Sequence, residues 1–234
     1  MPLSKSPDAE DVGRSVRYFP AVGLILGIII YLLYRLLISF LPSNQADLLM
    51  VVALLLLTGG LHFDGFLDSC DGLFGYRTPE HRLEIMRDSR VGSFGVAGGW
   101  VLLTLKYISL LNVPSDLKIA ALLLAPMLGR WALVNAVVLF PYGRESGLGI
   151  IYKQHTTRRE LILATLAVGL IAVLVLRVWG IILSLLVWVL TILLGKWVMS
   201  KLPAGLTGDS YGFVTEFCEM AVWFVLAAAA SLIR

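Results

Sequence analysis

Charged side chains are scarce in this chain. Only 15% of its 234 residues are Asp, Glu, Lys or Arg, whereas 58% are hydrophobic, and the mean hydropathy is +0.85. A soluble domain of this length would carry roughly 25% charged residues. The shortage of charge excludes an ordinary soluble enzyme and predicts an all-α integral membrane bundle.

Cysteine, net charge and internal repetition are also low. The cysteines are Cys70 and Cys218, and the net charge is +3. Both cysteines are expected on the cytoplasmic side, where disulfides are rare, so we interpret them as unpaired packing thiols. So small a charge gives no reason to expect a nucleic-acid partner. Without repeats or low-complexity tails, the sequence predicts a single membrane domain over residues 1–234, with a polar segment at 1–17.

Long apolar runs are what the chain does have. About 20 apolar residues are needed to cross the hydrocarbon of a bilayer as a helix. Seven spans are predicted on this basis, at 18–41, 46–63, 93–112, 117–140, 160–176, 178–199 and 217–233.

The positions of Lys and Arg predict the orientation of these spans, because cytoplasmic loops collect positive charge. Most of the Lys and Arg residues fall on one side if the N-terminus is cytoplasmic. The first seventeen residues also lack the apolar core of a signal peptide. Lys106 is expected to snorkel from the outer end of its span, whereas Arg130 lies deeper and needs a partner.

Three aspartates follow the second apolar run, in "LTGGLHFDGFLDSCDGLFGYR". If residues 64–75 are helical, Asp64, Asp68 and Asp71 form one acidic stripe. Gly75 would share that arc and let a ligand approach the backbone. Each carboxylate would cost about 2.5 to 3.5 kcal/mol at membrane depth, and a divalent cation would remove that cost. Oxygen ligands without cysteine favour Mg²⁺, or Mn²⁺, over zinc, although a solvated helix end is the alternative.

A histidine and a basic segment lie on either side of this stripe. On a continuous helix His62 would point away from the aspartates, so it joins them only if the chain breaks near Gly65. Its role as ligand or base stays open against that of an interfacial residue. The next segment, "YRTPEHRLEIMRDSRVGSFG", predicts a helix that begins at Thr78 and Pro79. It brings Arg87, Asp88 and Arg90 to the site, where guanidinium groups suit a phosphate ester; alternatively, they only follow the positive-inside bias.

Two further cytoplasmic patches carry polar residues and glycines. "FPYGRESGLG" contains Arg144 and suits a phosphate or nucleotide contact, and "AGLTGDSYGFVTEFCE" contains Asp209, which could complete a metal shell or orient a hydroxyl. Glu216 and Glu219 could instead cap the N-terminus of the last span.

Together, "GGLHFDGFLDSCDG", "RDSRVGSFG" and "LTGDSYG" resemble the cobalamin synthase family, the membrane-bound adenosylcobinamide-GDP ribazoletransferases; "RYFPAVGLILG" and "PYGRESGLG" also match. The resemblance implies a bacterial inner-membrane enzyme with its active site facing the cytoplasm. It would join α-ribazole, or its 5′-phosphate, to adenosylcobinamide-GDP with Mg²⁺ and release GMP. By motif, the resemblance implies these functional positions: His62, Asp64, Asp68, Asp71, Arg87, Asp88, Arg90 and Asp209.

These positions can be given roles in a phosphoryl transfer, which asks mainly for positioning and charge neutralisation. The three aspartates of the stripe would hold the metal, and Arg87 and Arg90 would take the developing charge. Asp88, and after it His62 or an aspartate of the stripe, is the candidate base. We expect substrate contacts from Gly75, Arg144 and Asp209. Gly23 and Gly27, one turn apart, suggest a close helix contact and allow a homo-oligomer.

Two other functions compete with this interpretation. A CDP-alcohol phosphotransferase also places aspartates on membrane helices, but Phe66 and Leu67 stand where its glycine-arginine pattern would not fit. An ion or metal transporter would show inverted repeats and polar groups near mid-bilayer, whereas the acidic groups are expected at one face.

Overall fold

The computed structural model describes residues 8–229, so residues 1–7 of the predicted polar segment and 230–233 of the last predicted span lie outside the described residues. Within residues 8–229 the regular structure is helical, apart from one isolated bridge between Tyr142 and Leu206, and the all-α prediction is confirmed. The elements are α1 Ala9–Arg14, the 3₁₀ turn η1 Ser15–Tyr18, α2 Phe19–Leu37, α3 Ser43–Leu57, α4 Leu61–Leu73, α5 Pro79–Ile85, α6 Ser93–Asn112, α7 Lys118–Leu139, α8 Leu148–His155, α9 Arg158–Leu176, α10 Val178–Lys201 and α11 Gly208–Ala228.

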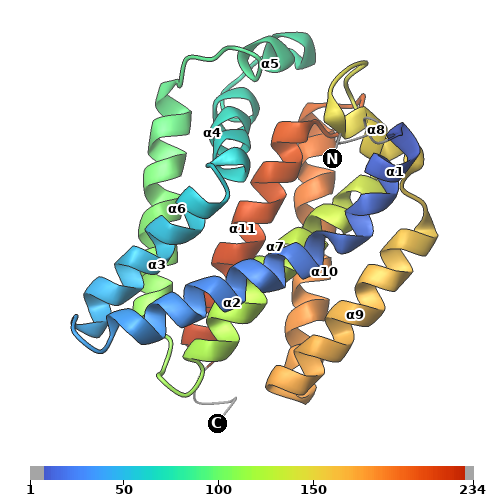
Figure 1. Ribbon diagram of the computed structural model, residues 1–234. Coiled ribbons are helices and arrows are strands. Elements are labelled where there is room, and N and C mark those ends of the chain that lie inside the picture. The colour runs from blue at the N-terminus through green and yellow to red at the C-terminus, as the bar shows by residue number, and fades with distance from the viewer. Residues whose placement is uncertain (1–7, 230–234) are drawn as a thin grey trace, which may run out of the picture.

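The predicted membrane spans are recovered as helices. Six helical segments are long and apolar enough to cross a bilayer, and the bent pair of α3 and α4 makes up to a seventh. Helix α1 and the end of α11 lie at opposite ends of the bundle in Figure 1, as an odd number of crossings requires. The bundle is therefore that of an integral membrane protein.

The second predicted span, 46–63, is broken in the structure. Thr58 follows the end of α3, and its hydroxyl donates to the carbonyls of Leu54 and Leu55. Gly59 and Gly60 then adopt φ of 61° and 70°, in the left-handed region where glycine carries no steric cost. The chain turns by 90° and α4 begins at Leu61. This bend gives the acidic stripe a short helix of its own.

Helix α7 is the centre of the bundle and is buried along most of its length. Helix α2 packs closely against it, because Gly23 and Gly27 face the α7 backbone. A Cβ at Gly23 would clash with the carbonyl oxygen of Pro126, and one at Gly27 would lie 2.8 Å from that of Leu122. These glycines make a contact within one chain, so they give no support to a homo-oligomer.

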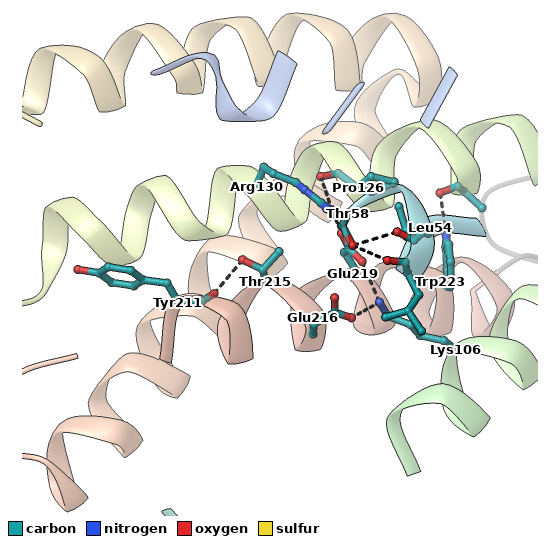
Figure 2. A network of polar contacts seen from close by, with 12 residues as sticks. Leu54, Thr58, Lys106, Pro126, Arg130, Tyr211, Thr215, Glu216, Glu219 and Trp223 are labelled. Carbon is teal, nitrogen blue, oxygen red and sulfur yellow. Dashed lines mark hydrogen bonds and ion pairs between the residues drawn. The ribbon is translucent and has the colours of Figure 1, made fainter. Parts of the chain in front are cut away.

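Four charged side chains meet inside the bundle, as Figure 2 shows. The ammonium group of Lys106 donates to Glu219, at 2.8 Å, and to Glu216, and Arg130 pairs with Glu219. All four side chains are at most 7% exposed. Two cations and two anions therefore cancel one another, where an unpaired charge would be costly.

This charged cluster corrects three expectations from the sequence. Lys106 does not snorkel outward, because its Nζ is buried against Glu216. Glu216 and Glu219 do not cap a helix N-terminus, since α11 begins at Gly208 and they lie in its interior. Charges are also present deep within the spans. The need of Arg130 for a partner is confirmed.

We predict that Glu219→Gln lowers the stability of the protein strongly. The substitution keeps the volume and leaves the buried cations with a single anion, which costs about 3–5 kcal/mol. Thermal unfolding in detergent micelles measures the change. The matched control is Glu10→Gln, because Glu10 forms an exposed ion pair with Arg14 that contributes at most about 1 kcal/mol. Equal shifts of Tm in the two variants would contradict the cluster's role.

The α2–α7 contact gives a second prediction. Gly23→Ala should destabilise the protein, because the added methyl group meets the α7 backbone. A Cβ at Gly169, in α9, would meet nothing within 4 Å, so Gly169→Ala should be neutral or stabilise by up to about 1 kcal/mol. The same unfolding measurement compares the two variants, and tolerance of Gly23→Ala would show that the helices are not in close contact.

Candidate functional site

Four segments meet at one end of the bundle: the end of α4, the segment from α5 to α6, the loop between α7 and α8, and the start of α11 (Figure 1). The amide of Gly143 donates to the carbonyl of Leu206 at 2.8 Å, and the amide of Leu206 donates to Pro141 at 2.9 Å. Arg144 reaches the carbonyl of Met86 at 3.3 Å. The four polar patches singled out in the sequence therefore share one end, as predicted.

Helices α4 and α11 approach each other closely at two glycines. A Cβ at Gly65 would lie 2.9 Å from the Cα of Asp209, and one at Gly212 would lie 2.7 Å from the carbonyl oxygen of His62. Larger residues at either position would separate the helices. The contact places Asp64 and Asp209 on the wall of one cavity.

The acidic stripe forms on a continuous helix, but its members differ in their surroundings. Asp68 lies within electrostatic range of both Asp64 and Asp209. The carboxylate of Asp71 instead accepts hydrogen bonds from the amides of Gly92, at 2.7 Å, and Gly95, at 2.8 Å. These amides belong to the start of α6, where free N–H groups favour an anion. Asp71 therefore anchors α6 to α4.

Gly75 lies beyond the end of α4 and so is not on the acidic arc. Its φ is 83°, and its carbonyl accepts a hydrogen bond from Arg82 at 2.9 Å. Arg82 is 5% exposed and also donates to the carbonyls of Gly72 and Leu73, at 2.8 and 2.6 Å. It thereby satisfies the free carbonyls at the end of α4. Sequence reasoning missed this role, because nothing in the sequence distinguishes Arg82 from the other arginines of this basic segment.

Helix α5 begins as predicted, with Thr78 accepting a hydrogen bond from the amide of His81 at 3.4 Å. After α5, Arg87 and Arg90 are exposed. Asp88 accepts hydrogen bonds from the side chain and amide of Arg90, at 2.6 to 3.1 Å. These bonds lower the pKa of Asp88 to about 2. Asp88 is therefore a weak proton acceptor near neutral pH.

Arg144 forms an ion pair with Asp209, with 2.7 Å between Nη2 and Oδ2. Thr207 caps α11 through the amide of Ser210 and also donates to Asp209 at 3.3 Å. Among the described residues, the pair of Arg144 and Asp209 is the only ion pair that involves Asp64, Asp68 or Asp209. The site therefore keeps an excess of negative charge.

Carboxylates such as those of this site are the kind of ligand that a hard divalent cation prefers. Within residues 8–229, however, no three His, Cys, Asp or Glu side chains are arranged so that they alone could hold a metal ion. Mg²⁺ is usually bound by one or two carboxylates, with substrate phosphates and waters completing its shell. Asp64, Asp68 and Asp209 are the carboxylates from which such a site could take its one or two protein ligands.

His62 lines the same cavity as Asp64 and Asp209, which has a volume of about 260 Å³. Helix α4 is continuous through Gly65, and the charges that act on the His62 ring belong to Arg130, Glu216 and Lys106 rather than to the aspartates of the stripe. Its Nδ1 is buried and has no hydrogen-bond partner. His62 therefore borders the cavity, but its Nδ1 does not open into it.

Sequence reasoning also missed three aromatic residues of this cavity. Phe19 comes from α2, Tyr152 from α8 and Tyr211 from α11. No spacing could have linked them, because they are far apart in the chain. The only signal was that Phe19 and Tyr211 lie within the quoted motifs.

The chain is similar to known proteins over nearly its whole length. The family model for cobalamin-5-phosphate synthase matches residues 1–227. A protein from Roseiflexus sp. (strain RS-1) is 38% identical over 223 residues, covering 95% of this chain and 82% of the relative. One from Desulfitobacterium hafniense (strain Y51) is 39% identical over 235 residues, covering 97% and 91%. Both are described as adenosylcobinamide-GDP ribazoletransferases, and no solved structure matches the chain. The chain therefore belongs to the cobalamin-5-phosphate synthase family.

Proposed function

We propose that this chain performs the adenosylcobinamide-GDP ribazoletransfer of cobalamin nucleotide-loop assembly with the acidic residues that α4 and α11 bring together. The assignment of the reaction is supported by the membership of the chain in the family. The observation that supports the location is the shared cavity wall of Asp64 and Asp209, with Asp68 in electrostatic range. Membership also removes the two alternatives, the CDP-alcohol phosphotransferase and the transporter.

In this proposal Asp64, Asp68 and Asp209 hold Mg²⁺, or Mn²⁺, together with the pyrophosphate of adenosylcobinamide-GDP. When bound, the cation neutralises phosphate oxygens and the charge on the departing GMP. Arg144 holds Asp209 in position through their ion pair. In this proposal Arg87 and Arg90, which are exposed after α5, contact the phosphates of the donor.

The transfer itself exchanges one phosphorus–oxygen bond for another. A ribose hydroxyl of α-ribazole, or of its 5′-phosphate, bonds to the phosphorus attached to cobinamide, the bond to GMP breaks, and the hydroxyl proton leaves. Asp88 was the first candidate to accept that proton, but its hydrogen bonds to Arg90 make it a weak base. His62 and the aspartates of the stripe are the other candidates to accept that proton.

We further propose that the site faces the cytoplasm from the bacterial inner membrane. If the N-terminus is cytoplasmic, most of the Lys and Arg residues fall on the same side of the membrane as the site, which is typical of a cytoplasmic face. Both substrates are water-soluble, so this side also gives them access.

The first test is metal-dependent GMP release by the purified full-length protein. We expect release from adenosylcobinamide-GDP and α-ribazole to stop under chelation and return with Mg²⁺. Asp68→Asn should lower turnover by about 100-fold or more, because a metal ligand supports several kcal/mol of charge stabilisation. The control is Asp11→Asn in α1, an exposed aspartate outside the site. Turnover of Asp68→Asn close to that of the control would refute the ligand role.

A second test separates the two substrates. Arg87→Ala should raise the KM for adenosylcobinamide-GDP by about 10-fold or more, because a hydrogen bond to a charged group contributes about 1.5–3 kcal/mol. The KM for α-ribazole should hardly move. Arg159→Ala removes an exposed arginine at the start of α9 and serves as the control. Equal increases in both KM values would count against a phosphate contact.

A further inference from the structure

A groove of about 390 Å³, which the proposed function does not use, lies between α2 and α9. Both helices pack against α7, and η1 packs against the start of α9. From the corner where α1 and α8 lie, α2 and α9 diverge in Figure 1. Two small exposed side chains, Ala21 of α2 and Ala167 of α9, line the groove, together with Met127 of α7. The groove is therefore open at the surface of the bundle, with α7 behind it.

Most of this groove is apolar and follows α9 toward the middle of the membrane. Leu163, Ala167 and Ile171 line it at intervals of four residues, so they share one face of α9. These positions extend over about 12 Å along the helix. One leaflet supplies about 15 Å of the hydrocarbon thickness. The apolar part of the groove is therefore about as long as one leaflet is deep.

One end of the groove is polar, because it is formed by Arg17 and Tyr18 of η1. The Nη2 of Arg17 donates to the hydroxyl of Tyr18 at 2.7 Å, and the guanidinium carbon lies 4.7 Å from the centre of the Tyr18 ring. Tyr18 is 55% exposed, and its hydroxyl keeps its own proton to donate. Guanidinium and hydroxyl donors side by side suit a phosphate oxygen.

The charge of Arg17 is not neutralised within the protein. Among residues 8–229, no carboxylate forms an ion pair with it. Glu10 of α1 pairs with Arg14 instead, and Glu160 of α9 accepts hydrogen bonds from Thr157 in the capping box. The exposed Arg158, at the start of α9, adds a further positive charge to this end of the bundle. An anion would therefore complement the polar end of the groove.

We propose that this groove binds one anionic phospholipid from the leaflet on the same side as the acidic site. Arg17 and Tyr18 donate to its phosphate, at the depth where the first span begins. One acyl chain lies along α9, over Ala167 and Met127. Basic pockets between membrane helices bind anionic headgroups in this way.

The two ends of the groove distinguish this occupant from others. A small soluble phosphate compound would leave the apolar part empty. An apolar helix of a second copy of this chain would leave the charge of Arg17 without a partner. A zwitterionic lipid brings its own cation close to the phosphate, so it complements the basic end less well.

The experiment is native mass spectrometry of the full-length protein in detergent, titrated with phosphatidylglycerol or with phosphatidylcholine of the same acyl chains. The wild-type protein should bind phosphatidylglycerol about 5-fold more tightly or better, because nearby arginines favour an anionic lipid. Arg17→Gln should raise the Kd for phosphatidylglycerol by about 10-fold and remove most of this preference. Ala167→Trp fills the groove and should raise both Kd values by about 5-fold or more.

Each variant has a matched control. Arg35 lies at the other end of α2 and also donates to a tyrosine, Tyr31, at 3.2 Å. Arg35→Gln therefore removes the same charge and the same kind of hydrogen bond away from the groove. Leu174→Trp places a tryptophan on the exposed surface of α9 outside the groove, because Leu174 is 74% exposed. Both controls should change the Kd values by no more than about 2-fold.

Equal affinity of the wild-type protein for the two lipids would overturn the proposal, and this result needs no variant. Equal losses in Arg17→Gln and Arg35→Gln would overturn it too, because they would show a general attraction between charges. Unchanged Kd values in Ala167→Trp would exclude the groove. Dimers that bind no lipid and are lost in Ala167→Trp would identify a second copy of the chain as the occupant instead.

Discussion

The site depends on the close contact between α4 and α11, which Gly65 and Gly212 make possible. Through this contact, carboxylates from two helices distant in the chain border one cavity. Charge is balanced in the interior of the bundle but not at the site. In its interior, Lys106 and its partners cancel, so the cluster holds the helices together without attracting a ligand. At the site, the carboxylates of Asp64, Asp68 and Asp209 outnumber the one cation that pairs with them, Arg144, and a divalent cation would neutralise this excess of negative charge.

Hydropathy predicted most of the fold, because the thickness of the bilayer fixes the length of a spanning helix. The predicted span 93–112 has the bounds of α6. The break before α4 was missed, since Gly59 and Gly60 end an apolar run without any change in hydropathy. The last helix also begins earlier than predicted. Its first turns carry polar residues and glycines that resemble a loop, and its interior glutamates are stable there only because cations from other helices reach them.

Helical periodicity predicted the acidic stripe correctly, because side chains four and three residues apart share a face. It could not tell Asp71 from its neighbours, since the amides that occupy Asp71 belong to another helix. Asp88 lies in one of the motifs that indicated the site. Its ion pair with Arg90 depends on the conformation of the loop, which the sequence does not show. The edge-to-face contact between Phe19 and Tyr152 is a tertiary feature that no local pattern encodes. Sequence thus located the candidate groups, and tertiary packing determines which of them are already occupied by contacts within the protein.

The central claim is that the carboxylates of α4 and α11 form one cation site that also binds the donor's pyrophosphate. Electron–nuclear double resonance of Mn²⁺ bound to the wild-type protein tests it directly, because phosphorus has an appreciable isotropic coupling to the metal only when a phosphate oxygen is a ligand. The account predicts a ³¹P coupling that appears when adenosylcobinamide-GDP is added. Bound Mn²⁺ that shows no ³¹P coupling in the presence of saturating donor would contradict it.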